Sequence, residues 1–212
     1  FGDRFMNEEY MNNTTFAGNA IGLQPGRYAY LIIDGGIVRQ YQKNGVDFVS
    51  LVHSDIKLKG FEEAAEQARM SGTDVFVTAK TVEELAAKIG IDADKLQDTI
   101  DEYNDMCDCG ADDKFHKDQK YLRPITGKGG YYAGKLYLGA YGTLGGVRIN
   151  KYCEVLDGEQ KRIPGLYSAG TDANTIYGDS YNFTLPGNTM GFAVNSGRLA
   201  GFAMSDYIES LS

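Results

Sequence analysis

The sequence predicts an α+β fold, in which helices and short strands occupy different stretches of the chain. Residues 27–34 and 46–52 are strand-like, because aromatic and β-branched residues lie between turn signals. Residues 60–110 carry apolar residues at helical spacing, and residues 136–212 alternate short strands with turns. The polar, glycine-rich stretch 110–135 places a domain boundary near Pro124 to Gly130. We therefore predict one domain over 1–125 and another over 126–212.

The helical region is predicted from its capping residues. Residues 61–68 have helical periodicity, and residues 74–79 form a short strand-like run. Thr81 followed by Glu84 is a capping box, and Gly90 ends the helix that it begins. Asp92 caps a second helix. Its apolar face is formed by Leu96, Ile100, Tyr103 and Cys107. We expect these helices to be a packing layer without functional residues.

Turns are expected at 34–36 and 44–45.

Composition excludes several classes of function. The net charge of −8 disfavours nucleic acid as a partner, because phosphate binding needs a basic surface. No apolar run approaches the length of a membrane span. Three cysteines and two histidines lack the spacing of a zinc site, so we predict no metal. Free thiols favour a reducing compartment, but the localisation stays open. The abrupt start at Phe1 suggests a fragment or a processed product.

The closing segment, 163–201, carries the strongest signal for a ligand. An apolar strand over 166–169 ends in Gly170, a polar, glycine-rich loop follows, and a helix begins near Asn188. One stripe of that helix contains Met190, Ala193, Val194, Gly197, Gly201, Met204 and Ile208. Small residues let a backbone or flat ligand approach closely, and a helix N-terminus suits negative charge. A tightly packed terminal helix behind a turn explains these features equally well.

Four motifs resemble one family in the same order along the chain. "IPGLYSAG" (163–170) and "PGN…GRLAG" (186–201) resemble the C-terminal flavin segment of the fumarate reductase/succinate dehydrogenase flavoprotein family, which includes the 3-ketosteroid dehydrogenases. "GDRFMNE" (2–8) is similar to a segment of its mobile capping domain. Residues 81–105, followed by "YLRPI" (121–125), resemble the cap's helical pair, and "GTLGGVRIN" (142–150) resembles the strand returning to the flavin domain.

The resemblance implies a substrate-covering cap over 1–125, followed by the C-terminal strand–loop–helix part of an FAD-binding α/β domain. It also implies FAD as cofactor. The last helix would contact the flavin through Gly187, Asn188, Thr189 and Met190. The loop after the strand would pass the ribityl chain at Ala169, Gly170 and Thr171. Many relatives carry an acidic residue at the last of these positions, and here Asp172 is the neighbouring alternative.

No G-x-G-x-x-G unit lies between a strand and a helix in this chain. The N-terminal dinucleotide-binding region of the family is therefore a missing partner. We expect the chain alone to bind FAD weakly or not at all.

Three positions that grip and protonate a dicarboxylate in fumarate reduction differ here. The proton-donating arginine position is Asn12, the substrate-binding histidine position is Tyr141, and the carboxylate-binding arginine position is Thr184. Loss of bidentate arginine recognition argues against fumarate or succinate. We expect instead a small-molecule substrate with an activated C=C bond, such as an enone or enoate, exchanging hydride with flavin N5 in a direction that stays open.

Tyrosines are the candidate acids. Tyr181 lies in "GDSY", which is similar to a ketosteroid dehydrogenase motif, and Tyr181 and Tyr141 are the predicted proton donors. Alternatively, both rings stack on the flavin or only line the pocket. Arg27 and Arg39 in the cap are candidates for a substitute cation. A ketosteroid-type dehydrogenase is one rival function. A non-catalytic binding or assembly module without its own flavin is the other.

Overall fold

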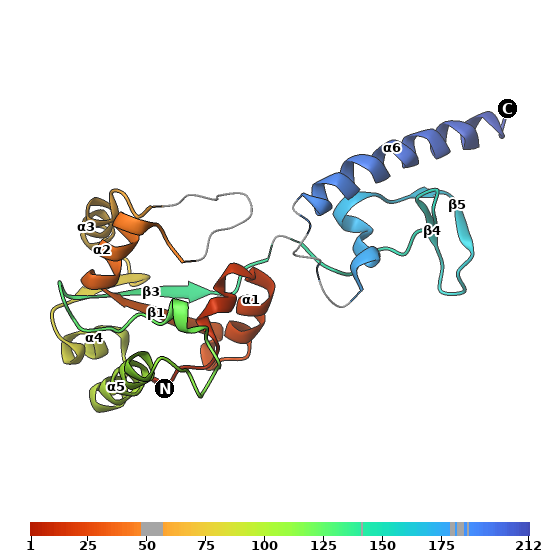
Figure 1. Ribbon diagram of the computed structural model, residues 1–212. Helices are drawn as coiled ribbons and strands as arrows, with labels where there is room; N and C mark the ends of the chain where they lie inside the picture. Colours follow the sequence, from red (N-terminus) through yellow and green to blue (C-terminus); the bar gives the residue numbers. More distant parts are fainter. Residues whose placement is uncertain (48–56, 141, 179–180, 182–184, 186) are drawn as a thin grey trace. The chain divides into compact units, whose positions relative to one another are not determined.

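In a computed structural model the chain forms two compact units, residues 1–139 and 140–212, each described here by itself (Figure 1). The structure describes residues 1–47, 57–140, 142–178, 181, 185 and 187–212. The boundary lies further along the chain than the predicted 125/126, because residues 131–137 form a strand that belongs to the first unit. The sequence boundary followed glycine content, whereas the structural boundary follows strand pairing.

The N-terminal unit is built on a three-stranded antiparallel sheet. Its strands are β1 (Tyr28–Asp34), β2 (Phe76–Ala79) and β3 (Tyr131–Tyr137), in the order β1-β3-β2. The central strand pairs Ala133 with Ile32 on one side and with Val77 on the other. Ala133 is fully buried. The predicted strands at 27–34 and 74–79 are therefore confirmed, while most of the predicted strand at 46–52 falls outside the described residues.

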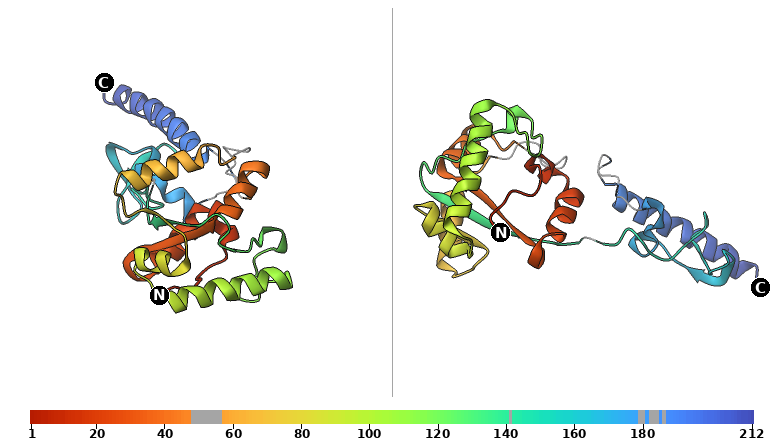
Figure 2. Two further views of the ribbon diagram at one scale, coloured as in Figure 1. Left: turned by 90° about the vertical axis from the view of Figure 1, so that its left-hand side faces the viewer. Right: turned by 90° about the horizontal axis from the view of Figure 1, so that it is seen from below.

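Helices cover both faces of this sheet, with α2 and α3 on one side and α4 and α5 on the other (Figures 1 and 2). The α-helices of the unit are α1 (Thr14–Gly22), α2 (Gly35–Asn44), α3 (Phe61–Met70), α4 (Val82–Ile89) and α5 (Ala93–Cys109). Short 3-10 helices are η1 (Glu8–Asn12), η2 (Pro25–Arg27) and η3 (Gln119–Tyr121). The core contains Ala79, Val82, Leu85, Ala86, Ile89, Leu96, Ile100 and Ala133. The predicted packing layer is thus the core-forming pair α4 and α5.

The predicted caps hold these helices. The backbone N–H of Glu84 donates to the Thr81 hydroxyl over 3.2 Å, and Glu84 accepts from the N–H of Lys80 over 2.7 Å. Asp92 accepts from the first turn of α5, and Gly90 ends α4 in a left-handed conformation. The turn predicted at 34–36 is wrong. The buried Asp34 carboxylate accepts from the N–H of Ile37 over 2.8 Å, so these residues begin α2.

The C-terminal unit packs two short strands and irregular segments against one long helix. β4 (Glu154–Leu156) and β5 (Arg162–Tyr167) are antiparallel, and α6 (Asn188–Glu209) begins where the sequence predicted. η4 (Gly170–Asp172) and η5 (Asn174–Tyr177) lie between β5 and α6. The strand expected over 142–150 forms only isolated bridges, at Gly146 and Ile149. No described helix is long and apolar enough to cross a membrane.

Candidate functional site

The N-terminus of α6 is the best-built candidate for binding a ligand. Gly187 precedes the helix with φ 75°, a left-handed conformation that suits glycine, and at this N-cap position it has no side chain that could accept from the first turn. The first helical hydrogen bond runs from the N–H of Gly191 to the carbonyl of Gly187 over 2.8 Å. The N–H groups of a first helical turn lack carbonyl partners within the helix, and they carry the positive end of its dipole. This end of α6 can therefore stabilise negative charge.

Two tyrosines hold the side chains of the first two α6 residues. The Tyr177 hydroxyl donates to the side-chain oxygen of Asn188, and the hydroxyls of Tyr181 and Thr189 lie 2.5 Å apart. The two tyrosine rings are in contact, with centroids 5.1 Å apart. The structure thus brings Tyr181 together with Thr189, one of the predicted flavin contacts, and Tyr177 together with Asn188, another. The sequence offered no spacing rule for Tyr177, whose partner lies 11 residues away.

The loop after β5 is fastened to α6 by a buried serine. The backbone N–H of Gly170 donates to the Ser196 hydroxyl over 2.9 Å, and Ser196 donates to the carbonyl of Phe192 over 2.6 Å. Gly170 has φ 65°, and an added Cβ would lie 3.4 Å from that of Ala193. The site therefore fixes the predicted ribityl contact Gly170 against the helix. Ser196 was not predicted, because a lone serine in an apolar helix carries no recognisable signal.

The neighbours of Gly170 differ in their environment. Ala169 is half-buried, and Thr171 is exposed, with its methyl group 3.7 Å from where a Cβ on Gly142 would lie. Asp172, the alternative acidic group, is exposed, and its backbone carbonyl accepts from the N–H of Val147 over 2.7 Å. All three can face a ligand chain, but none is held as firmly as Gly170.

The predicted apolar stripe of α6 faces outward within this unit. Met190, Val194 and Ile208 are 72%, 66% and 66% exposed, whereas Ser196 and Ala200 point into the unit. Beside the buried side lies a cavity of about 370 Å³. Its lining includes Ile149, Asn150, Cys153, Ile176, Phe192 and Leu199. Burial raises the pKa of the Cys153 thiol, so this cysteine is a packing group rather than a nucleophile.

The remaining predicted residues are only partly tested by the structure. Tyr141 and Thr184 lie outside the described residues, as does the side chain of Asn12 at the end of η1. Arg39 donates to the carbonyl of Lys128 over 2.9 Å, and Arg27 is an exposed residue with φ 56°. Among the described residues, no group of three or more His, Cys, Asp or Glu side chains is placed to hold a metal ion.

The donor set of the C-terminal unit fits one end of a flavin. The start of α6, with glycine at its N-cap, offers backbone N–H groups, Thr189 offers a hydroxyl, and Gly170 offers close backbone approach. These groups suit the electron-rich pyrimidine edge of the ring. They do not account for the adenosine diphosphate half of FAD.

Comparisons with known proteins identify the family. The family described as "FAD binding domain" matches residues 2–189. The chain is 33% identical to the vinyl phenol reductase of Lactiplantibacillus plantarum, over 100% of this chain and 43% of that protein. It is 30% identical to the fumarate reductase (cytochrome) of Shewanella frigidimarina, over 97% of this chain and 31% of that protein.

A solved structure gives the same picture. The crystal structure of 3-ketosteroid Δ1-dehydrogenase from Sterolibacterium denitrificans, in complex with 1,4-androstadiene-3,17-dione, superimposes with a TM-score of 0.68 and 28% identity. The match covers 97% of this chain and 37% of that one. The chain therefore spans less than half the length of each of these relatives. The resemblance to fumarate reductases and 3-ketosteroid dehydrogenases is confirmed.

Proposed function

The chain belongs to the family of FAD-binding domains, and from that premise we propose that it forms part of an oxidoreductase that moves hydride between FAD and an activated C=C bond. The C-terminal unit supplies one end of the flavin site, and the N-terminal unit covers the substrate. The observation that carries the proposal is the start of α6, where two tyrosines bond the side chains of the first two helical residues, together with the Gly170 loop fastened to Ser196 of the same helix.

FAD, when bound, supplies the hydride chemistry. The first turn of α6 would hold the flavin through its backbone N–H groups, and its dipole would favour negative charge on the bound cofactor. Thr189 holds the Tyr181 hydroxyl at that end of the helix, where the phenol donates a proton to the substrate. The N-terminal unit excludes water from the reacting atoms when it closes.

The substrate class follows from the residues at the three changed positions. Asn12, Tyr141 and Thr184 offer no permanent positive charge, so a dicarboxylate would lack its strongest anchors. One relative that matches over 100% of this chain is named a vinyl phenol reductase, and a vinyl phenol carries an alkene on a phenol ring. We therefore favour an enone, an enoate or an alkene conjugated to an aromatic ring.

A ketosteroid-type dehydrogenase is the second candidate, favoured by the match to the 3-ketosteroid dehydrogenase structure. Both functions use a flavin and a carbonyl- or ring-activated bond, but they differ in direction and substrate size. Assays of the flavin-loaded protein with a steroid panel and with small enones, enoates and vinyl phenols separate the two. Oxidation of a steroid with no reduction of any small alkene would favour the second candidate.

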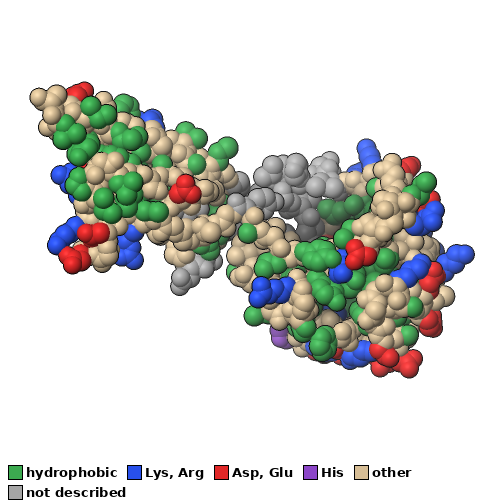
Figure 3. All heavy atoms as spheres, turned by 180° about the vertical axis from the view of Figure 1, so that it is seen from behind, with side chains coloured by type: hydrophobic (Ala, Val, Ile, Leu, Met, Phe, Trp, Pro, Cys, Tyr) green, Lys and Arg blue, Asp and Glu red, His purple; other side chains and the backbone are tan. Residues whose placement is uncertain are grey.

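The exposed side of the C-terminal unit is suited to a further protein region. Phe202 and Ile208 of α6 are 59% and 66% exposed, and β5 exposes Leu166. Figure 3 shows many hydrophobic side chains on the surface of this unit. Such a surface marks an interaction site. We propose that it packs against the dinucleotide-binding region expected from the family. Without that region the chain would be a binding module rather than an enzyme.

The first test is a visible absorption titration of the purified chain with FAD. We expect no stable flavin band for the chain alone, and a band when the N-terminal dinucleotide-binding part of the vinyl phenol reductase is added. In the mixture with that dinucleotide-binding part, Asn188→Asp places a negative charge at the α6 start and is expected to weaken FAD binding at least tenfold. Asn195→Asp, the same change on an exposed turn of α6, is the matched control. Equal FAD affinity of both variants would contradict the proposed flavin contact.

A further inference from the structure

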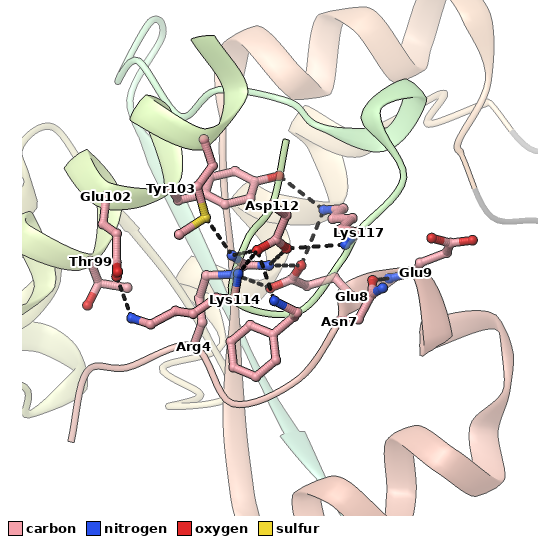
Figure 4. Close-up of polar contacts among 12 residues, drawn as sticks. Arg4, Asn7, Glu8, Glu9, Thr99, Glu102, Tyr103, Asp112, Lys114 and Lys117 are labelled. Carbon is pink, nitrogen blue, oxygen red and sulfur yellow. Dashed lines mark hydrogen bonds and ion pairs between the residues drawn. The ribbon is translucent and has the colours of Figure 1, made fainter. Parts of the chain in front are cut away.

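A buried cluster of charges fastens the N-terminal segment of the chain to the loop after α5 (Figure 4). Arg4 donates to both carboxylate oxygens of Asp112, over 3.3 and 2.7 Å, and to both of Glu8, over 2.8 and 2.9 Å. The Arg4 side chain is 10% exposed, and that of Asp112 is 0% exposed. A guanidinium that meets two carboxylates through paired hydrogen bonds is held in one orientation.

Aromatic rings and a second cation complete the cluster. The Arg4 guanidinium lies 4.8 Å from the Tyr103 ring centroid and 5.1 Å from that of Phe115. Lys117 donates to the Tyr103 hydroxyl over 3.0 Å and lies 3.4 Å from Glu8. Two cations and two carboxylates therefore balance in the cluster. Burial opposes ionisation of Asp112, but the hydrogen bonds from Arg4 and from the backbone outweigh it and lower its pKa to about 2.

The cluster lies directly before the segment that bears the changed proton-donor position. Glu8 begins η1, Asn7 caps it, and Glu9 accepts from the N–H of Asp118 over 3.2 Å. After η1, Asn13 caps α1. The segment Asn7–Gly22 is thus joined at its start to the loop after α5.

The outward face of that segment is aromatic. Tyr10 of η1 and Phe16 of α1 are 51% and 52% exposed, and their rings meet edge to face with centroids 6.0 Å apart. Asn12 lies between them in the chain. The segment thus has the buried charge cluster on one side and exposed aromatic rings on the other. A segment that covers a substrate requires both, since its position must be fixed before it closes.

We infer that Arg4 is a positioning residue of the covering unit: by joining Glu8 to Asp112 it fixes the Asn7–Gly22 segment where that segment meets the substrate. The inference rests on the proposed function for the place of the substrate. That Arg4 fixes the Asn7–Gly22 segment rests only on the contacts within the N-terminal unit. Arg4 does not touch the reacting atoms. It acts through the segment that follows it.

The test compares Arg4→Met with Lys95→Met. The second change removes an exposed ion pair between Lys95 of α5 and Asp3, the residue before Arg4 in the chain. In the flavin-loaded protein, Arg4→Met is expected to raise KM for the alkene at least tenfold while kcat and the flavin spectrum stay within about twofold of wild type. Amide exchange over 8–22 is expected to rise at least tenfold, with α4 unchanged. Lys95→Met is expected to alter neither.

Arg4→Lys keeps the charge without the two-sided fork, and it serves if Arg4→Met does not fold. It is expected to raise KM and the exchange rate over 8–22 in the same way, by a smaller factor. The inference is overturned if KM stays within twofold of wild type, or if exchange rises equally throughout the unit, which is general destabilisation. If wild-type protein turns over no alkene or steroid, the proposed function fails, and amide exchange alone decides whether Arg4 holds the segment.

Discussion

Replacing Ser196 by alanine should loosen the Gly170 loop without unfolding the C-terminal unit. The change removes the acceptor for the buried Gly170 N–H, which lies 2.9 Å from the hydroxyl. A buried N–H left without a partner costs about 1–3 kcal/mol. Loss of the bond from Ser196 to the Phe192 carbonyl costs little, since serine bonds to its own helix contribute weakly. We take a net effect of about 2 kcal/mol, which corresponds to about a 30-fold change in local opening.

The assay is hydrogen exchange at the Gly170 amide, read residue by residue by NMR. Ser196→Ala is expected to speed its exchange about 30-fold, and to speed that of the α6 amides far less. Ser210→Ala is the matched control, because Ser210 also donates to a carbonyl of its own helix, over 2.6 Å, but is exposed. The reasoning is refuted if Gly170 exchanges within about threefold of wild type, or if the control speeds it equally.

Three further outcomes are expected. Leu85→Ala, at a side chain with 0% exposure, should cost about 2–5 kcal/mol in urea unfolding, whereas Leu211→Ala, at 69% exposure, should stay within about 0.5 kcal/mol. Since the folded pKa of Asp112 is about 2, below its ordinary 3.8, stability should fall by about 1–2 kcal/mol as pH drops from 4 to 2, and Asp112→Asn should remove that part of the slope in acid titrations. Tyr181→Phe should lower kcat at least 100-fold with FAD affinity unchanged, and Tyr177→Phe should lower it less; equal losses would assign both phenols a packing role.

Local signals in the sequence were enough for the helices around the core. The side chains of Thr81 and Asp92 cap the starts of α4 and α5, and the left-handed backbone of Gly90 ends α4. The start of α6 at Asn188 follows in the same way from the glycine before it. Such predictions succeed because partner and donor are a few residues apart, and no distant contact has to be known.

The first compact unit extends past the predicted boundary for a physical reason. Glycines at 127–130 have the composition of a linker, but here they allow close packing. Gly35 donates its N–H to the carbonyl of Gly130 over 3.0 Å, and a Cβ on Gly35 would lie 2.9 Å from the carbonyl oxygen of Gly129. The glycines therefore mark a tight approach beside the sheet rather than a flexible connection, and composition alone does not distinguish the two.

Contacts between distant residues escaped the sequence for a related reason. Ser196 meets Gly170 across 26 residues, and Arg4 meets Asp112 across 108. The segments that carry the family resemblance include Arg4, Gly170 and Ser196 but not Asp112, and the resemblance assigned none of them a partner. Burial of a polar side chain is visible only once the fold is known, and both contacts use polar groups that would be exposed in an average protein.

Through α6, cofactor binding is coupled to the binding of a further protein region on the exposed face of the C-terminal unit. Ser196 and Ala200 pack inward, while Val194, Phe202 and Ile208 remain exposed. Burying one such large side chain contributes about 1.5–3 kcal/mol, so a region that covers this face gains appreciable binding free energy. The same helix presents its N-terminus to the flavin in our proposal. A region that contacts both the helix face and the cofactor must therefore bind more tightly when FAD is present, and FAD must bind more tightly, by the same factor, when that region is present.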